Sequence, residues 1–273
     1  MKDEKFIDVE KLIASKNKKA AKWTPRFLIR YLKRILHEKD INAFLTEHQH
    51  LKNQEWCAEV VKYMNITIDV KNLDKVPREG KIVIAMNHPL GGMDAMILVN
   101  ALSGQRDDLK FIVNDLLMSL ENMSEMFVGI NKHGKNKGSI REQINELFQS
   151  EQAVCIFPAG LVSRKQKGEV KDLIWKKTFV TYAKEFDRTI IPIYIDGELS
   201  KFFYRLARFR KFIGVKMNVE MLYLANELYK QRNKHMRFIV GDPIEQSFLN
   251  ATEDNRKLAQ DIKDKVYELR NQL

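Results

Sequence analysis

From Ile66 to Val240, short apolar runs alternate with segments in which apolar residues recur at helical spacing. Strands that alternate with helices pair in parallel, because each crossover returns the chain to the same end of the sheet. This alternation predicts an α/β fold with a mostly parallel central sheet flanked by helices. The expected strands are 66–70, 81–86, 109–113, 126–130, 153–157, 189–195, 217–224 and 236–240, and the expected helices are 93–103, 114–120, 140–148, 173–186 and 253–273.

The first 65 residues have a different pattern, with helices expected near 23–36, 41–50 and 54–64. We therefore divide the chain into an N-terminal amphipathic helical segment, 1–65, and an α/β domain, 66–273. The first helix is basic and amphipathic, a pattern typical either of a helix packed on a protein core or of one lying in a membrane interface. A second basic and aromatic stretch covers 201–211. The candidate membrane-facing residues are Trp23, Phe27, Arg30, Tyr31, Arg34, Phe202, Phe203, Arg205 and Arg208.

The net charge of +11 indicates an anionic partner, either nucleic acid or an acidic membrane surface. No glycine-rich RNA-binding signature or helix-turn-helix pattern stands out, so no nucleic acid is expected and an acidic membrane surface remains as the partner. No window approaches the roughly 18 apolar residues of a membrane span, and Cys57 and Cys155 form no paired motif. The expected location is cytoplasmic, peripheral on the inner face of the cell membrane.

The most informative stretch runs from Ile82 to Asp94. The apolar strand ends at Asn87-His88, Pro89 cannot continue a ladder, and Gly91-Gly92 permit backbone angles that are closed to other residues. A histidine at the end of a strand and a carboxylate at the start of the next helix can form a general base with its orienting partner. The alternative is an ordinary turn in which Asp94 caps a helix.

Two further strands end in polar or turn-forming residues. Phe157-Pro-Ala-Gly160 follows one strand, with Ser163 and Arg164 just beyond, and Asn131-Lys132 follows another. Backbone N–H groups at such a turn can bind an oxyanion or a phosphate, although each corner by itself is also consistent with a simple loop. In a parallel sheet these carboxyl ends meet at one edge, where sites form.

Two other kinds of site are disfavoured by spacing. The six histidines and two cysteines show no metal-ligand pattern, so no metal is expected. Ser163 together with His88 and Asp94 suggests a serine hydrolase, but no Gly-x-Ser-x-Gly elbow surrounds the serine.

Taken together, these motifs resemble those of the lysophospholipid acyltransferase family, which includes bacterial 1-acylglycerol-3-phosphate acyltransferases. The family's Asn-His…Asp, Phe-Pro-Glu-Gly and Val/Ile-Pro-Ile motifs correspond to Asn87-His88…Asp94, Phe157–Gly160 and Ile190–Ile193, in the family's order. The resemblance covers about residues 66–245. Five residues rather than four separate His88 from Asp94, Ala159 replaces the usual glutamate, and Asn131 or Lys132 stands where an arginine is common. These departures are similar to the hemolysin-like and lyso-ornithine-lipid acyltransferase branch.

The resemblance implies an O-acyltransferase that moves a fatty acyl group from an acyl-CoA or acyl carrier protein thioester to the hydroxyl of a lyso-lipid, without a cofactor. It implies His88 and Asp94 as the catalytic residues. The departures favour a lyso-aminolipid of the N-acyl ornithine or N-acyl glycine type, with 1-acylglycerol-3-phosphate or a non-catalytic lipid-binding role as the alternatives. The expected substrate-binding residues are Asn87, Gly91, Gly92, Asn131, Lys132, Phe157, Pro158, Ala159, Gly160, Ser163 and Arg164.

Overall fold

The structure is a computed structural model, and it describes residues 5–16, 23–114, 117–130 and 137–273. The chain forms two compact units, each discontinuous in sequence. The first comprises residues 1–52 and 199–231, and the second comprises residues 53–198 and 232–273. The sequence predicts a linear division at residue 65, whereas the helix Asn53–Tyr63 belongs to the second unit and the segment 199–231 belongs to the first.

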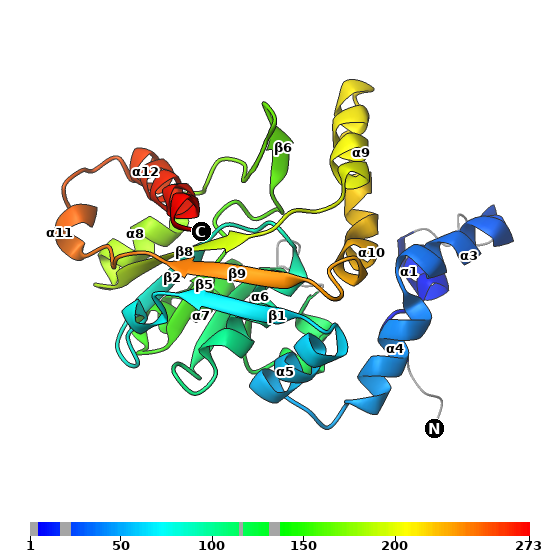
Figure 1. The fold of residues 1–273 in the computed structure, drawn as a ribbon, viewed down its shortest axis with the longest axis horizontal. Coiled ribbons are helices and arrows are strands. Elements are labelled where there is room, and N and C mark those ends of the chain that lie inside the picture. Colours follow the sequence, from blue (N-terminus) through cyan, green and yellow to red (C-terminus); the bar gives the residue numbers. More distant parts are fainter. Residues whose placement is uncertain (1–4, 17–22, 115–116, 131–136) are drawn as a thin grey trace. The chain divides into compact units, whose positions relative to one another are not determined.

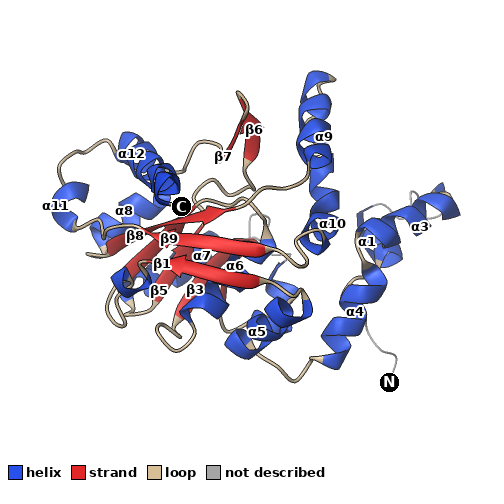
Figure 2. Cartoon of the chain, in the orientation of Figure 1, coloured by secondary structure: helices blue, strands red, loops and turns tan. Residues whose placement is uncertain are grey.

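The second unit is built on a seven-stranded sheet with the strand order β1-β9-β8-β2-β5-β3-β4 (Figures 1 and 2). Among the described strands of this sheet, only the β8–β9 pair is antiparallel, so the mostly parallel sheet predicted from the sequence is confirmed. The strands are β1 (Thr67–Lys71), β2 (Ile82–Met86), β3 (Leu109–Asn114), β4 (Phe127–Ile130), β5 (Ala153–Ile156), β8 (Thr189–Asp196) and β9 (His235–Val240).

Helices cover both faces of this sheet. On one face, Val83 and Ala85 of β2 pack in a core cluster with residues of α7, α8 and α12. Because side chains alternate along a strand, Ile84 and Met86 point to the opposite face, where α5 and α6 pack against each other. All five residues of β2 are buried, as expected for a central parallel strand. The helices are α5 (Asn53–Tyr63), α6 (Gly92–Leu102), α7 (Lys137–Gln149), α8 (Thr178–Glu185), α11 (Gln246–Leu249) and α12 (Asn255–Glu268).

A buried arginine, Arg188, binds backbone carbonyl groups near the amino-terminal ends of the central strands. The Arg188 side chain donates to the carbonyl groups that end α7, at Leu147 (2.9 Å), Phe148 (2.8 Å) and Ser150, and to those of Gln152 (2.7 Å) and Ile82 (3.0 Å). The guanidinium therefore satisfies orphan helix carbonyls while holding β2 near the loop that leads into β5.

The first unit is helical. It contains α1 (Val9–Lys16), α3 (Arg26–Ile35), α4 (Glu38–Glu47), α9 (Lys201–Phe212) and α10 (Leu224–Tyr229). The amino-terminal helices contact the 199–231 segment through a hydrogen bond between the Tyr31 and Tyr223 hydroxyls and a stacked pair, His37 and Tyr229, with ring centroids 3.9 Å apart. In the described part of the chain, no helix is long and apolar enough to cross a bilayer.

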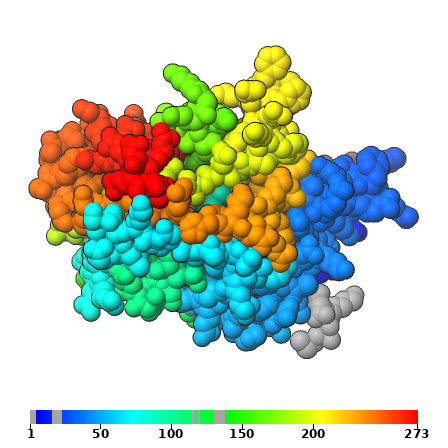
Figure 3. Space-filling view, viewed as in Figure 1, coloured from blue at the N-terminus to red at the C-terminus, as the bar shows by residue number. Residues whose placement is uncertain are grey.

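Several predicted elements differ from the structure. The strand predicted at 217–224 is wrong: Val219–Tyr223 forms a 3-10 helix because Glu220 is buried and bound by Arg210, with Nε to Oε2 at 2.8 Å. The helix predicted at 173–186 begins only at Thr178, and 114–120 contains a 3-10 turn at Leu117–Ser119. The sequence analysis also missed the hairpin of β6 (Arg164–Gln166) and β7 (Glu169–Lys171), which projects from the surface of the second unit (Figure 3).

Candidate active site

The end of β2 brings a histidine and an aspartate into direct contact. Nδ1 of His88 lies 2.9 Å from Oδ2 of Asp94, and the same oxygen accepts the Leu90 N–H at 3.0 Å. Gly91 makes this turn possible, because its φ of 76° and ψ of −138° lie in a region that only glycine enters readily. The turn at Gly91 thus accommodates the additional residue between His88 and Asp94. Asp94 is held in the first turn of α6.

Burial sets the electrostatics of this pair. The Asp94 side chain is 0% exposed and Oδ1 has no hydrogen-bond partner among the described residues. Burial raises the pKa of the Asp94 carboxyl, and the hydrogen bond and positive charge of His88 oppose that increase. The His88 side chain is 18% exposed, so one ring nitrogen faces the carboxylate and the other remains accessible. A neutral imidazole that donates from Nδ1 to Asp94 has its lone pair on Nε2, the arrangement of a general base.

The end of β5 lies beside this pair because β2 and β5 are adjacent and parallel, with Ala85 opposite Ile156. The Phe157 ring stacks on the His88 ring with centroids 4.0 Å apart. The chain then turns, with the Gly160 N–H donating to the Phe157 carbonyl at 2.9 Å and Gly160 at a φ of 67°. This N–H is therefore engaged within the turn itself.

A second buried aspartate organises the backbone around the histidine. Oδ1 of Asp172 accepts the His88 N–H at 3.2 Å and the Ser163 hydroxyl at 2.5 Å, while Oδ2 accepts the Trp175 indole N–H at 2.9 Å. The Ser163 N–H also donates to the His88 carbonyl, at 2.8 Å. The Ser163 hydroxyl therefore donates its hydrogen bond to Asp172 and not to the His88 ring, so Ser163 is not placed as a nucleophile. Nothing in the local sequence marked Asp172, a lone aspartate in a loop.

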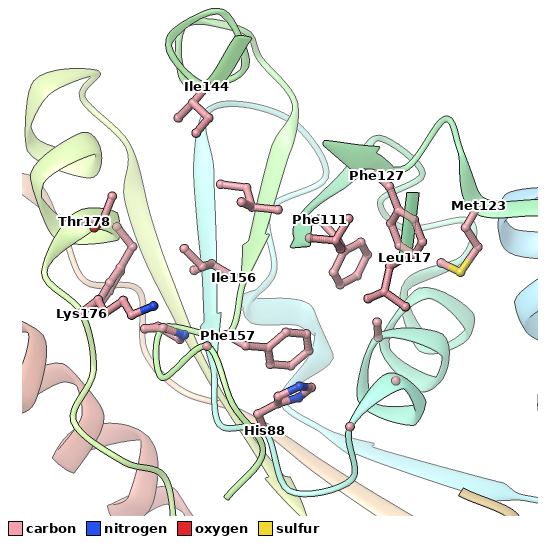
Figure 4. A pocket seen from close by; sticks show the side chains of 18 of the residues that line it. His88, Phe111, Leu117, Met123, Phe127, Ile144, Ile156, Phe157, Lys176 and Thr178 are labelled. Carbon is pink, nitrogen blue, oxygen red and sulfur yellow. The ribbon is translucent and has the colours of Figure 1, made fainter. Parts of the chain in front are cut away.

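His88 opens onto an apolar cavity of about 410 Å³. Figure 4 shows His88 and Ile144 at opposite ends of the view, with Ile156 between them and the side chains of Phe111, Phe127 and Met123 to one side. The described polar side chains of the lining are few: His88, Lys176, Thr178 and Tyr182. Such a space suits an alkyl chain whose reactive end lies beside the imidazole.

The structure separates the predicted substrate-binding residues into two groups. Gly91, Gly92, Phe157, Pro158 and Gly160 line the cavity together with His88. The other described residues of that prediction do not line it, because each is engaged elsewhere. Asn87 exchanges two hydrogen bonds with the Ile195 backbone, Ala159 is packed in the core, and Arg164 lies in β6 with its guanidinium 2.7 Å from the Val162 carbonyl. Asn131 and Lys132 lie outside the described residues.

The membrane-facing prediction is wrong for Phe203. Successive helical residues are about 100° apart, so Phe202 and Phe203 cannot share one face, and Phe203 is 0% exposed in α9. Trp23, Phe27, Phe202 and the arginines at 30, 34, 205 and 208 are exposed, whereas Tyr31 is partly buried against Tyr223.

A mostly parallel sheet with a histidine and an aspartate paired at the carboxyl end of β2 agrees with the acyltransferase family that the sequence motifs predict, and the comparisons with known proteins agree as well. A family model described as Acyltransferase matches residues 11–273, and the chain belongs to this family of enzymes. The crystal structure of the 1-acyl-sn-glycerophosphate (LPA) acyltransferase PlsC from Thermotoga maritima matches with a TM-score of 0.51 and 16% identity, covering 88% of this chain and 95% of that one. It establishes a shared fold.

The chain is also similar to two curated proteins named lyso-glycine lipid O-acyltransferase. The one from Phocaeicola vulgatus is 38% identical over 265 residues, covering 97% of this chain and 95% of the relative. The one from Bacteroides thetaiotaomicron is 37% identical over 265 residues, covering 97% of each chain. These similarities confirm the family inferred from the sequence motifs.

Proposed function

We propose that this acyltransferase moves a fatty acyl group from a thioester to the hydroxyl of a lyso-aminolipid, an N-acylated glycine, with His88 as the general base. The observation that carries the proposal is the 2.9 Å contact between His88 Nδ1 and Asp94 Oδ2 at the mouth of an apolar cavity. The names of the two relatives support the choice of acceptor. The donor is acyl-CoA or acyl carrier protein, and a thioester is sufficiently activated to need no covalent enzyme intermediate.

The chemistry follows from the tautomer that Asp94 favours. Nε2 of His88 takes the proton of the acceptor hydroxyl while the oxygen attacks the thioester carbonyl carbon. Asp94 holds the ring and stabilises the imidazolium that forms. When the tetrahedral intermediate collapses, the C–S bond breaks and the imidazolium returns its proton to the thiolate. The products are the O-acylated lipid and a free thiol.

The test uses purified enzyme, acyl-CoA or acyl carrier protein as the donor, and two acceptors assayed separately, a hydroxyacyl glycine and 1-acylglycerol 3-phosphate. We expect acylation of the glycine acceptor and a loss of at least about 10³-fold in kcat for His88→Ala. His235→Ala is the matched control, since that exposed histidine of the same unit contacts Thr67, away from the cavity. Acylation of the phosphate acceptor alone would refute the choice of acceptor, and an active His88→Ala enzyme would refute the base.

We further propose that the helical unit binds an anionic membrane surface, from which the acceptor enters. Trp23 is 87% exposed, Phe27 69% and Phe212 86%, and arginines and lysines lie among them in α3 and α9. Exposed aromatic side chains beside cationic ones are typical of interfacial helices. Flotation with phosphatidylglycerol vesicles should show binding that weakens as salt rises, and Trp23→Ala with Phe27→Ala should reduce it. Equal flotation of the wild type and this double variant would contradict the proposal.

A further inference from the structure

Among the described residues that line the cavity, Lys176 is a cation to which the mechanism assigns no role. Lys176 lies between β7 and α8, lines the same cavity as His88, and directs its side chain inward from the side of the view opposite Met123 (Figure 4). Its ammonium group has no hydrogen-bond or ion-pair partner among the described residues, and no described carboxylate lines the cavity. Lys176 is an exposed residue, so its ammonium group lies at the open rim of this largely apolar pocket, where a cation attracts an anionic ligand. We infer that Lys176 binds the carboxylate of the acceptor, which deepens the proposed function and rests on it.

The backbone holds this lysine in a fixed relation to the histidine. The Lys176 N–H donates to the Pro158 carbonyl at 3.1 Å, within the turn whose Phe157 ring stacks on His88. The preceding residue, Trp175, is buried and donates its indole N–H to Asp172, the carboxylate that also accepts the His88 N–H. The segments that carry Lys176 and His88 thus both contact the turn at Phe157-Pro158 and the carboxylate of Asp172. The backbone positions from which the lysine and the histidine extend are therefore linked through the same turn and the same carboxylate.

Gly160 leaves space for the lysine side chain. A Cβ atom at this position would lie 3.0 Å from Lys176 Nζ, closer than ordinary contact, and the φ of 67° independently favours glycine. The backbone conformation of the turn is thus what favours glycine, and the short distance shows that the lysine ammonium lies directly over this turn.

The start of α8 adds to the positive potential. Thr178, the first residue of the helix, also lines the cavity. The residue before it makes no side-chain cap hydrogen bond, and the first turn contains no acidic residue. The uncapped N–H groups of a helix start attract anions. One lysine with one helix start matches the single negative charge of an N-acyl glycine carboxylate.

The same anion chemistry also occurs in the donor, whose phosphates belong to CoA or to the carrier's prosthetic group. These phosphates are separated from the reacting carbonyl by the pantetheine arm, whereas the carboxylate of an N-acyl glycine adjoins its amide. A cation on the wall of the cavity that contains His88 therefore fits the acceptor better. The experiment must nevertheless distinguish the two sources.

Lys176→Met keeps the length of the side chain and removes its charge. Kinetics are measured with a hydroxyacyl glycine and with its methyl ester, each varied at saturating donor, and then with the donor varied. We expect kcat/KM for the acid to fall about tenfold or more, while the value for the ester and the KM of the donor stay unchanged. Lys176→Arg should keep most of the preference for the acid. Lys165→Met, which removes an exposed lysine of β6, is the matched control and should match the wild type.

Each other outcome overturns the inference for a different reason. Equal losses with acid and ester would place Lys176 at the reacting atoms, and a raised donor KM would assign it to the donor phosphates. An unchanged preference for the acid would remove any role in binding the carboxylate. A wild-type enzyme that acylates neither glycine acceptor refutes the proposed function itself, a result visible before any lysine variant is compared.

Discussion

Replacing Asp94 with asparagine removes the negative charge beside His88 while keeping the shape of the side chain. Oδ2 accepts both hydrogen bonds, from His88 Nδ1 and from the Leu90 N–H, and Oδ1 has no partner among the described residues. An asparagine can therefore place its oxygen at the Oδ2 position and its NH₂ group at the Oδ1 position. Both hydrogen bonds are then retained and only the charge is lost.

The size of the effect follows from the distance between the two groups. With Nδ1 and Oδ2 2.9 Å apart, the centres of charge lie about 4 Å from each other, and at an effective dielectric constant of about 20 their attraction is about 4 kcal/mol. The imidazolium exists only after proton transfer, so this energy is lost from the transition state and not from the bound substrate. Since each 1.4 kcal/mol corresponds to a factor of ten, we expect kcat to fall by up to about 10³-fold with little change in KM.

The assay is the initial rate of thiol release with a hydroxyacyl glycine acceptor, for the wild type, Asp94→Asn and Asp196→Asn. Asp196 is the control because it ends a neighbouring strand, β8, and pairs with Arg237 at the surface. Thermal denaturation shows whether each variant is folded. If Asp94→Asn keeps kcat within about threefold of the wild type while His88→Ala is inactive, the charge of Asp94 does not stabilise the imidazolium and the reasoning is refuted.

Two further predictions concern buried residues of the second unit, which contains the seven-stranded sheet. Burial lowers the pKa of Arg188 to about 10, so its guanidinium remains charged at neutral pH, and Arg188→Met should lower the free energy of unfolding by at least about 3 kcal/mol. A urea titration that shows a loss below about 1 kcal/mol would contradict the anchoring role. Burial raises the pKa of the Cys57 thiol to about 12, and it also raises the pKa of the Cys155 thiol. Because only the thiolate reacts, a thiol reagent at pH 8 should modify neither cysteine in the native enzyme. It should modify both cysteines after denaturation. Rapid modification of the native protein would contradict their burial.

The positions of most strands and the main site were accessible from local patterns. A short apolar run that stops at Asn87-His88 or at Phe157-Pro158 marks a strand end, because proline and polar residues cannot continue a buried ladder. Parallel pairing then places these ends together, as β2 and β5 confirm. The glycine pair at 91–92 indicated that Asp94 could approach His88, and the 2.9 Å contact agrees.

The direction in which a buried polar side chain points could not be predicted from the sequence in the same way. Asn87 and Ser163 occur within the expected motifs, yet Asn87 binds the Ile195 backbone and Ser163 binds Asp172. Both partners are remote from the motif or come from an unmarked loop. Buried polar groups must find hydrogen bonds, but which groups meet depends on packing between distant segments. For the same reason Glu220 became a buried partner of Arg210 in a segment whose alternation predicted a strand.

The class of fold, the family and the two residues at the centre of the proposed chemistry could all be predicted from the amino-acid sequence. These properties depend on patterns a few residues long, such as apolar runs, breakers and the spacing from His88 to Asp94. The groups around them became visible in the folded chain: the carboxylate of Asp172 beside the histidine backbone, the apolar cavity that His88 lines, and Lys176 in the lining of that cavity. Such neighbours are set by how separate strands and loops pack, and that information is spread over the whole chain.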